Sequence, residues 1–198
     1  MYTPFSEANQ KFSDIAHEAA RSLIYPNLLE SGQSSIEYKS VSVGDGGLNA
    51  ILDGEMAVDR LVKVSVDGLR GPLEHSIQER FRKPNFAKYR DITITEWNNN
   101  SGIKGELYKL KAGIFLYGYF DTLSATFGEV LAVDIPKLLL ALTTHSIPFS
   151  PERNGRTGQS FICLDFDLLY DAGLVLYHHK PQETFNSNER YQQLRGRD

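Results

Sequence analysis

The sequence has 198 residues, of which 41% are hydrophobic and 23% are charged, and its formal net charge at pH 7 is −4. A chain of this length and composition can bury one sizeable core, which argues against disorder and indicates a single domain over residues 1–180. The polar segment 181–198 lacks an apolar stripe and is predicted to be a tail. The negative net charge argues against a protein that holds nucleic acid through a basic surface alone, because such binding needs many phosphate contacts.

Neither membrane insertion nor secretion is expected. No apolar run approaches the roughly 18 to 20 residues of a membrane span. Residues 1–14 lack the basic start and the apolar block of a signal peptide. Cys163 is the only cysteine, so no internal disulfide can form, and no Cys/His group has zinc spacing. We therefore expect a cytoplasmic protein.

The N-terminal part of the chain predicts a helix that begins after Ser6 and ends at Pro26. Serine often caps a helix, and the residue before a proline rarely continues one. His17 and Glu18 fall on opposite flanks of its apolar stripe and so border the core. The residues of that stripe recur at helical spacing: Phe12, Ile15, Ala16, Ala19 and Leu23.

Alternating segments that follow the first helix predict β-strands. In the second strand the valines share one face and Asp59 lies on the other. In the third strand Ile77 and Glu79 share one face, whereas Gln78 and Arg80 share the opposite face. We expect these two strands to pair and the strand over 91–97 to join them as the third of the group. The Gly-Asp-Gly-Gly segment at 44–47 is expected to form a turn. The predicted strands are 35–43, 56–66, 74–82, 91–97, 107–120, 127–133 and 161–166.

Two further helices are predicted in the C-terminal half. Asp134 is a suitable cap for a helix with Pro136 in its first turn. A final helix over 167–178 would place His178 near its end, where an imidazole complements the helix dipole. Helices that flank a run of strands, some joined by short turns, indicate an α/β protein with a mixed sheet.

Several familiar catalytic signatures are missing from the sequence. There is no Walker loop, no Gly-x-Gly-x-x-Gly after a strand, no His-Glu-x-x-His and no Gly-x-Ser-x-Gly. We therefore expect no nucleotide cofactor. Cys163 lies within an apolar strand, which favours a small buried side chain over a nucleophile.

The remaining constellation is Asp59 on one strand with Gln78 and Arg80 on the next. Phosphodiester cleavage uses a divalent cation to polarise the phosphate and to activate a water. Magnesium prefers oxygen ligands, and a neighbouring cationic side chain stabilises the charge that develops on the phosphate. An acid on one strand would meet these needs if the neighbouring strand places an oxygen ligand and a cation on one face opposite it.

Basic residues are concentrated between positions 80 and 90, with aromatic residues among them. The cluster is consistent with local contacts to a nucleic acid. It is equally consistent with a solvated strand end and loop. Its basic members are Arg80, Arg82, Lys83, Lys88 and Arg90.

Four segments of the chain resemble the PD-(D/E)XK, or restriction-endonuclease-like, superfamily of nucleases. They include Ala16-His17-Glu18 and together span about the first 120 residues. The resemblance implies a mixed β-sheet core flanked by α-helices. Family members carry a first acid on the second core strand, and a second acid and a lysine on the third. The other three segments are AVDRLVKV (57–64), SIQERFR (76–82) and LYKLKAGIFLYG (107–118).

The resemblance implies a role for each candidate residue. Asp59 is the first acid, and Glu18 is the helical acid that some members add. Gln78 stands in the place of the second acid, and Arg80 stands in that of the lysine. Val58 precedes the first acid where the family has proline. An arginine is also a poorer proton carrier than a lysine, because it is effectively always charged.

A register shifted by one residue is an alternative. Glu79 would then be the metal ligand, and Phe81 would occupy the position of the cation. This arrangement needs a lysine from elsewhere, which Lys109 or Lys111 could supply.

The sequence thus predicts a metal-dependent DNA endonuclease that uses Mg²⁺, with Mn²⁺ as a substitute. Cutting both strands would favour a homodimer, because a two-fold axis matches two antiparallel strands. The replacements at Gln78 and Arg80 leave an alternative, in which the same fold has lost catalysis and binds nucleic acid or a protein. A structural or assembly protein is the third possibility.

Overall fold

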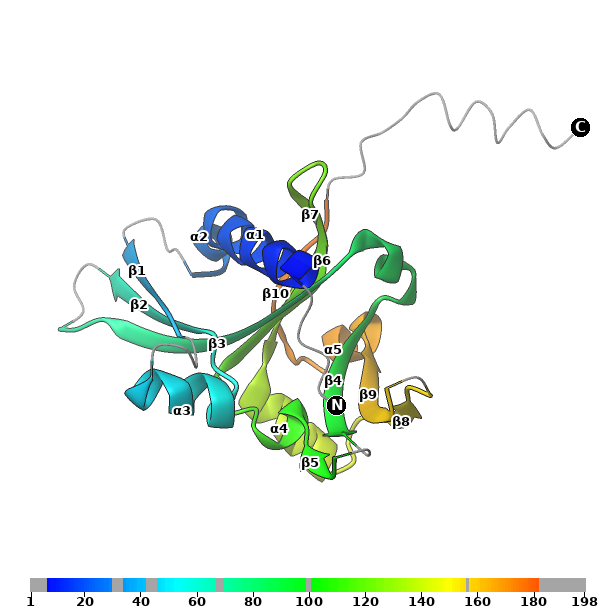
Figure 1. The fold of residues 1–198 in the computed structure, drawn as a ribbon. Coiled ribbons are helices and arrows are strands. Elements are labelled where there is room, and N and C mark those ends of the chain that lie inside the picture. The colour runs from blue at the N-terminus through cyan, green and yellow to red at the C-terminus, as the bar shows by residue number, and fades with distance from the viewer. Residues whose placement is uncertain are drawn as a thin grey trace, which may run out of the picture.

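The chain builds two β-sheets with helices on both sides of the larger one, a mixed α/β architecture (Figure 1). The computed structural model describes residues 7–29, 34–41, 46–66, 70–98, 101–155 and 157–181. The larger sheet has the order β1 (Ser34–Ser40), β2 (Arg60–Val66), β3 (Leu73–Arg82), β6 (Ile114–Asp121), β7 (Thr126–Asp134) and β10 (Val175–His179). The smaller sheet has the order β5 (Ile103–Lys104), β4 (Asp91–Asn98), β9 (Gln159–Asp165) and β8 (Ser150–Arg153).

Short and medium helices connect these strands. Two of them, η2 and η3, are 3₁₀-helices on either side of β4 and β5. The helices are α1 (Glu7–Leu23), α2 (Tyr25–Leu29), α3 (Gly47–Met56), η2 (Pro84–Tyr89), η3 (Glu106–Tyr108), α4 (Ile135–Thr143) and α5 (Phe166–Asp171). None of the helices in the described part of the chain combines the length and the apolar character that crossing a bilayer requires.

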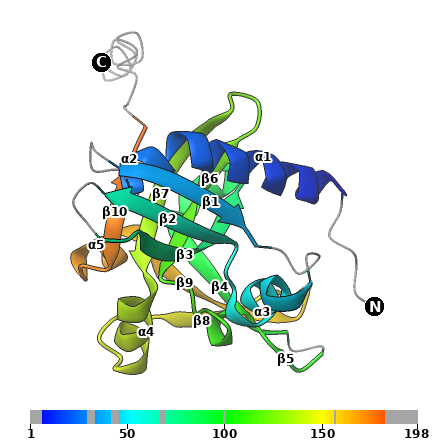
Figure 2. The same ribbon diagram turned by 90° about the vertical axis from the view of Figure 1, so that its left-hand side faces the viewer.

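The larger sheet separates two apolar cores. Helices α1 and α2 cover one of its faces, and the smaller sheet with α3, α4 and α5 lies on the other (Figures 1 and 2). Strand β6 contributes to both cores because successive side chains point to opposite faces. Leu116 and Phe120 pack toward α1, whereas Phe115, Tyr117 and Tyr119 pack toward the smaller sheet.

Within the described residues, every strand pair is antiparallel except β3 and β6, which run parallel. Parallel neighbours cannot be joined by a hairpin, so the chain between them must cross over. This crossover carries β4 away into the smaller sheet. The prediction that 91–97 is a third strand beside β2 and β3 is therefore wrong, although a strand does form there.

The first helix forms as predicted, but its buried stripe is narrower. Ala16 and Ala20 are fully buried, whereas Ile15 and Leu23 are 40% and 46% exposed. Pro26 does not end the helical region, because it lies in the first turn of α2, where its missing N–H costs no hydrogen bond. The predicted cap at Ser6 and the segment 182–198 lie outside the described residues.

Three other expectations are corrected. Helix α3 occupies 47–56 and begins at the last residue of the predicted glycine turn, of which 44 and 45 are not described, so the predicted strand 56–66 is shortened to β2. Residues 107–113 are not strand, so β6 is shorter than predicted. The last predicted helix ends at Asp171, and a glycine at φ +68° turns the chain into β10. His178 therefore lies on a strand, where its Nε2 is 2.8 Å from Glu129 Oε1.

The helix after Asp134 is confirmed together with its cap. Asp134 Oδ1 accepts a hydrogen bond from the Lys137 backbone N–H at 3.0 Å. The valines of β2 are also confirmed as its buried face, since Val62 and Val64 are nearly inaccessible. In both cases local chemistry and tertiary packing favour the same structure, which is why these predictions hold.

The cap supports a prediction about stability. Replacing Asp134 with alanine removes the acceptor for an otherwise unpaired helix N–H, so the free energy of unfolding should fall by about 1 kcal/mol. Asp134→Asn retains an acceptor and serves as the control. Urea unfolding followed by circular dichroism measures both variants, and an Asp134→Ala protein as stable as the parent would contradict this role.

Candidate functional site

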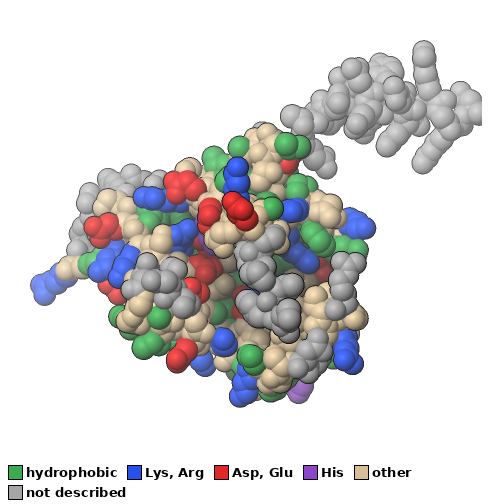
Figure 3. Space-filling model, viewed as in Figure 1, with side chains coloured by type: hydrophobic (Ala, Val, Ile, Leu, Met, Phe, Trp, Pro, Cys, Tyr) green, Lys and Arg blue, Asp and Glu red, His purple; other side chains and the backbone are tan. Residues whose placement is uncertain are grey.

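Two hollows meet near the start of β2, and their linings have opposite charge. Asp53 of α3 borders both of them. The acidic hollow, of about 450 Å³, is lined by Gln10, Ser13, Asp14, His17, Glu18, Ser40, Val41, Asp53, Asp59 and Arg60. The basic hollow, of about 300 Å³, is lined by Asp53, Gly54, Ala57, Gln78, Arg80, Thr95, Lys104, Gly105, Glu106 and Lys109. In the space-filling view, acidic side chains lie within the hollowed centre of the face shown, with Lys and Arg side chains around it (Figure 3).

Asp59 lies immediately before β2 and is attached to β3. Its backbone N–H donates to the Ile77 carbonyl at 2.9 Å. Its Oδ2 accepts from the Glu79 backbone N–H at 2.7 Å. Because Arg60 pairs with Ile77, the next position along the antiparallel ladder sets Asp59 opposite Gln78. The predicted neighbourhood of these two residues is thus confirmed.

The surroundings of Asp59 favour its protonated form. Burial is the largest cause, and the negative charges of Glu79 and Asp53 add to it. Together they outweigh the hydrogen bond from the Glu79 N–H and raise the pKa of Asp59 to about 7. A positive ion near this carboxylate would reverse the effect.

Glu79 is a buried carboxylate on the face of β3 that packs against α1. Tyr25 donates to its Oε1 at 2.6 Å, and Arg60 Nε donates to its Oε2 at 3.0 Å. His17 Nδ1 also contacts Oε2. Burial opposes ionisation of Glu79, but the hydrogen bond and charge of His17, with Arg60 and Tyr25, hold its pKa below the ordinary value.

His17 shows the reciprocal change. Burial disfavours the imidazolium, yet the hydrogen bond and the charge of Glu79 outweigh it and raise the pKa of His17 above 6.5. His17 and Glu79 therefore form an ion pair that links α1 to β3. His17 also borders the acidic hollow, which its position on the flank of the predicted stripe permits.

Gln78 and Arg80 lie on the other face of β3, in the basic hollow. Gln78 is 8% exposed, and within the described residues no donor reaches its Oε1. Arg80 is held in place by an ion pair with Glu106 at 2.6 Å and by a hydrogen bond to the Thr93 carbonyl at 3.1 Å. The prediction that Gln78 and Arg80 share a face is confirmed.

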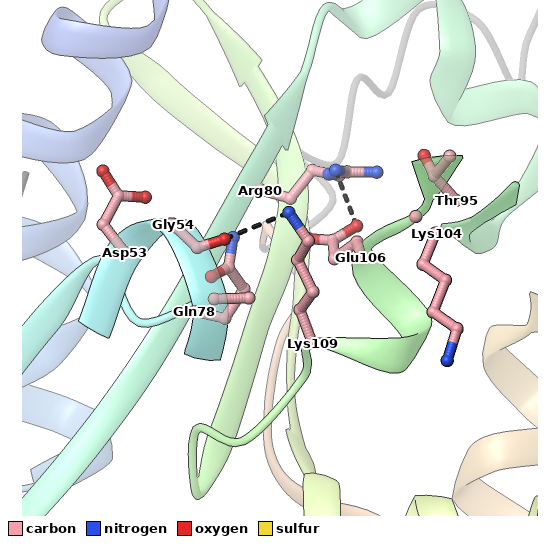
Figure 4. A pocket seen from close by; sticks show the side chains of 10 residues that line it. Asp53, Gly54, Gln78, Arg80, Thr95, Lys104, Glu106 and Lys109 are labelled. Atoms are coloured by element: carbon pink, nitrogen blue, oxygen red, sulfur yellow. Dashed lines mark hydrogen bonds and ion pairs between the residues drawn. The ribbon is translucent and has the colours of Figure 1, made fainter. Parts of the chain in front are cut away.

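Lys109 also enters the basic hollow, from the segment that follows η3 (Figure 4). Its Nζ donates to the Gly54 carbonyl at 3.0 Å. A carbonyl does not neutralise the charge of an ammonium group, so Lys109 brings a net positive charge close to Gln78. Lys111, the other lysine considered, is exposed and is not part of the lining.

Glu18 borders the acidic hollow with Asp59, but its side chain is 70% exposed and forms an ion pair with Arg21 at 3.7 Å. The candidates are thus divided. Glu18 and Asp59 face one hollow, Gln78 and Arg80 face the other, and Glu79 is buried on the α1 side of β3. Within the described residues, no three or more His, Cys, Asp or Glu side chains are arranged to hold a metal ion.

The predicted basic cluster is dispersed by the fold. Arg90 pairs with Glu129 at 2.9 Å and with Asp167 at 2.7 Å, far from the hollows. Lys83 and Lys88 lie over aromatic rings. Of the five basic residues of this cluster, Arg80 is the one that lines the basic hollow.

Sequence reasoning missed Asp53 and Tyr25. Asp53 is carried by α3, a helix that was not predicted. Tyr25 stands beside Pro26, where the first helix was expected to end. A signal for α3 was present, because its core-facing residues Leu52 and Met56 are four positions apart.

The two raised pKa values predict how stability depends on pH. A group whose pKa is raised by folding contributes stability at low pH and loses it as the pH rises through the folded value. The free energy of unfolding should therefore fall from about pH 4 to about pH 7 through Asp59, and fall further through His17 as the pH rises above 6.5. Urea unfolding at several pH values measures both declines.

Substitutions assign these declines to their residues. Asp59→Asn should abolish the decline in stability at lower pH, and His17→Gln should abolish the decline at higher pH. If His17→Gln leaves the decline at higher pH intact, the His17–Glu79 ion pair is not its source.

Comparisons of the chain with protein-family models, with curated protein sequences and with solved structures find no match. The candidate site is therefore defined by its own geometry. Its central features are Asp59, which precedes β2 and lines the acidic hollow, and Gln78 of β3, which lines the basic hollow.

Proposed function

We propose that this protein is a Mg²⁺-dependent DNA endonuclease with a restriction-endonuclease-like core. The observation that carries the proposal is the Gln78 side-chain oxygen, which is buried in the basic hollow without a donor, at the strand position next to Asp59. A buried acceptor that lacks a partner is costly, and a cation would satisfy it. Arg80 follows two residues later on the same face.

The order of the elements supports this core. The acid Glu18 lies on the first helix, Asp59 precedes the second strand, and Gln78 and Arg80 lie on the third. This is the order that the resemblance implies for the first acid, the second acid and the cation. The smaller sheet and α3 are additions to that arrangement.

The residues present suit a magnesium ion. Magnesium usually takes one or two carboxylates together with waters and a substrate phosphate, so a cluster of three acids is not required. The ion would have to lie where the two hollows adjoin, because Asp59 would hold it from the acidic hollow and Gln78 from the basic one. Asp53 borders both hollows and is the third candidate ligand. The oxygens of Glu79 already accept bonds from Tyr25, Arg60 and His17, which favours Gln78 over Glu79 as the ligand.

A magnesium ion bound there would polarise a phosphodiester and lower the pKa of an attacking water. The residues of the chain do the rest. Lys109 places a positive charge beside the phosphate, and Arg80, held by Glu106, lines the same hollow. Preorganised charges of this kind stabilise the transition state without reorganising during the reaction. Lys109 thus takes over the part that the resemblance assigns to the lysine of the third strand.

A second candidate is a binding module in which catalysis has been lost. Two observations favour it: Arg80 is engaged by Glu106, and the described residues contain no group of three metal-binding side chains. Such a protein would still attract a phosphate backbone to its basic hollow.

Cleavage of a plasmid separates the two candidates. With Mg²⁺ or Mn²⁺ the protein should nick or linearise supercoiled DNA, and a linear product would indicate a homodimer that cuts both strands. Asp59→Asn and Gln78→Ala should each lower the rate by about 100-fold or more, because several kcal/mol of metal-dependent stabilisation are lost. Glu74→Gln, an exposed carboxylate on the same strand, is the matched control. Binding of DNA without any cleavage would establish the binding module instead.

Lys109 and Lys111 give a second comparison. Lys109→Gln should slow cleavage by about 10²-fold to 10³-fold, as expected when a transition-state charge donor is removed. Lys111→Gln should leave the rate unchanged, because Lys111 does not line the hollow. Single-turnover cleavage of a labelled oligonucleotide measures both rates. Equal effects of the two substitutions would show that Lys109 acts only through the net charge of the protein.

A further inference from the structure

A third hollow lies next to the basic hollow, between β3 and the smaller sheet. We name it the Arg82 hollow, and its volume is about 230 Å³. It shares Arg80 of β3 and Thr95 of β4 with the basic hollow, so the two hollows adjoin at these residues. Its lining residues are Arg80, Arg82, Thr93, Thr95, Asn154, Gln159 and Phe161.

Among the described residues, the lining of the Arg82 hollow contains two arginines and no acidic side chain. Arg82 NH1 donates to Tyr117 Oη at 3.3 Å, and its contact with Asp91, at 4.0 Å, is long for an ion pair. The guanidinium lies over the Phe86 ring at 4.3 Å, which fixes its plane. Since a guanidinium has five N–H donors, Arg82 retains donors for an anionic ligand.

The opposite wall of the Arg82 hollow comes from the smaller sheet. Thr95 and Phe161 are paired across β4 and β9, so both contribute to the same wall. An aromatic ring beside a positively charged groove is the usual arrangement for binding single-stranded nucleic acid, because any base can stack on the ring.

The size of the Arg82 hollow limits what can enter. Pockets for small molecules measure about 300 to 1,000 Å³, so a hollow of about 230 Å³ accepts no more than a nucleotide-sized group. Two sheet layers form its walls, and a duplex would have to part before one of its strands could lie between them.

We propose that the Arg82 hollow binds one nucleotide of a single DNA strand, with the phosphate on Arg82 and the base against Phe161. The inference rests on the proposed endonuclease function, since this nucleotide would adjoin the phosphodiester held at Gln78. It assigns the substrate class: single-stranded or locally opened DNA in preference to a closed duplex.

Fluorescence anisotropy without metal tests this binding separately from cleavage. The full-length protein is titrated into a labelled single-stranded oligonucleotide and into the duplex of the same sequence, at several salt concentrations. The single strand should bind more tightly than the duplex. Arg82→Gln should weaken single-strand binding by about tenfold and reduce the salt slope by about 0.7, the value for one phosphate contact. Phe161→Leu should weaken it by about fivefold to tenfold through lost stacking.

Arg70→Gln is the matched control, because Arg70 is exposed in the connection between β2 and β3 and lines none of the three hollows. It should change the affinity by less than about twofold. Thermal unfolding verifies that each variant is folded, and Gln159→Ala replaces Arg82→Gln if that protein does not fold. Duplex binding as tight as single-strand binding, no binding at all, or unchanged affinity in folded Arg82 and Phe161 variants would overturn the proposal.

The two proposals can fail separately. Metal-dependent cleavage with unaltered binding by Arg82→Gln would remove the nucleotide subsite and leave the endonuclease. Single-strand binding that depends on Arg82, without cleavage under any metal, would retain the subsite and remove the endonuclease.

Discussion

A carboxylate inside a protein costs several kcal/mol unless charges and hydrogen bonds compensate for it, and Glu79 is only 4% exposed. Its compensation comes from three different elements. His17 belongs to α1, Tyr25 to α2 and Arg60 to β2. If any of these elements moved away from β3, a buried charge would lose a partner. The ion pair and hydrogen bonds of Glu79 thus fix the position of the first two helices against the sheet, and the site depends on that position.

The same residue orders the site through its backbone. The Glu79 N–H binds the carboxylate of Asp59, so the acid at the start of β2 is held against β3. Because side chains alternate along a strand, Glu79 on the α1 side requires Gln78 and Arg80 to face the other way. One strand therefore divides an acidic hollow from a basic one. A chain with a net charge of −4 can present a local surface for a polyanion in this way, since the opposite charges lie on different faces.

Local patterns predicted the strands on which the site is built. The alternation of valines identified β2, and the pattern around Ile77 predicted correctly that Gln78 and Arg80 share a face. Helix α3, which brings Asp53 to the junction of the hollows, was not predicted, because its signal in the sequence is only the four-residue spacing of Leu52 and Met56. None of the side chains of α3 is fully buried, so its apolar stripe is weak. The sequence could not predict that Glu106 holds Arg80 or that Lys109 reaches Gly54, because η3 lies about 25 residues from β3 along the chain.

By itself, the sequence determined the mixed α/β class, the first helix, the capped helix after Asp134 and the pairing of Asp59 with the third strand. These features depend on residues close together in the chain, where propensity, spacing and capping act directly. Tertiary structure alone decided that β4 joins a second sheet, that Glu79 is an internal ion-pair partner, and that Lys109 lines the basic hollow and binds the Gly54 carbonyl. Each of these depends on contacts between distant segments, and the periodicity of a strand does not encode which element will pack against it.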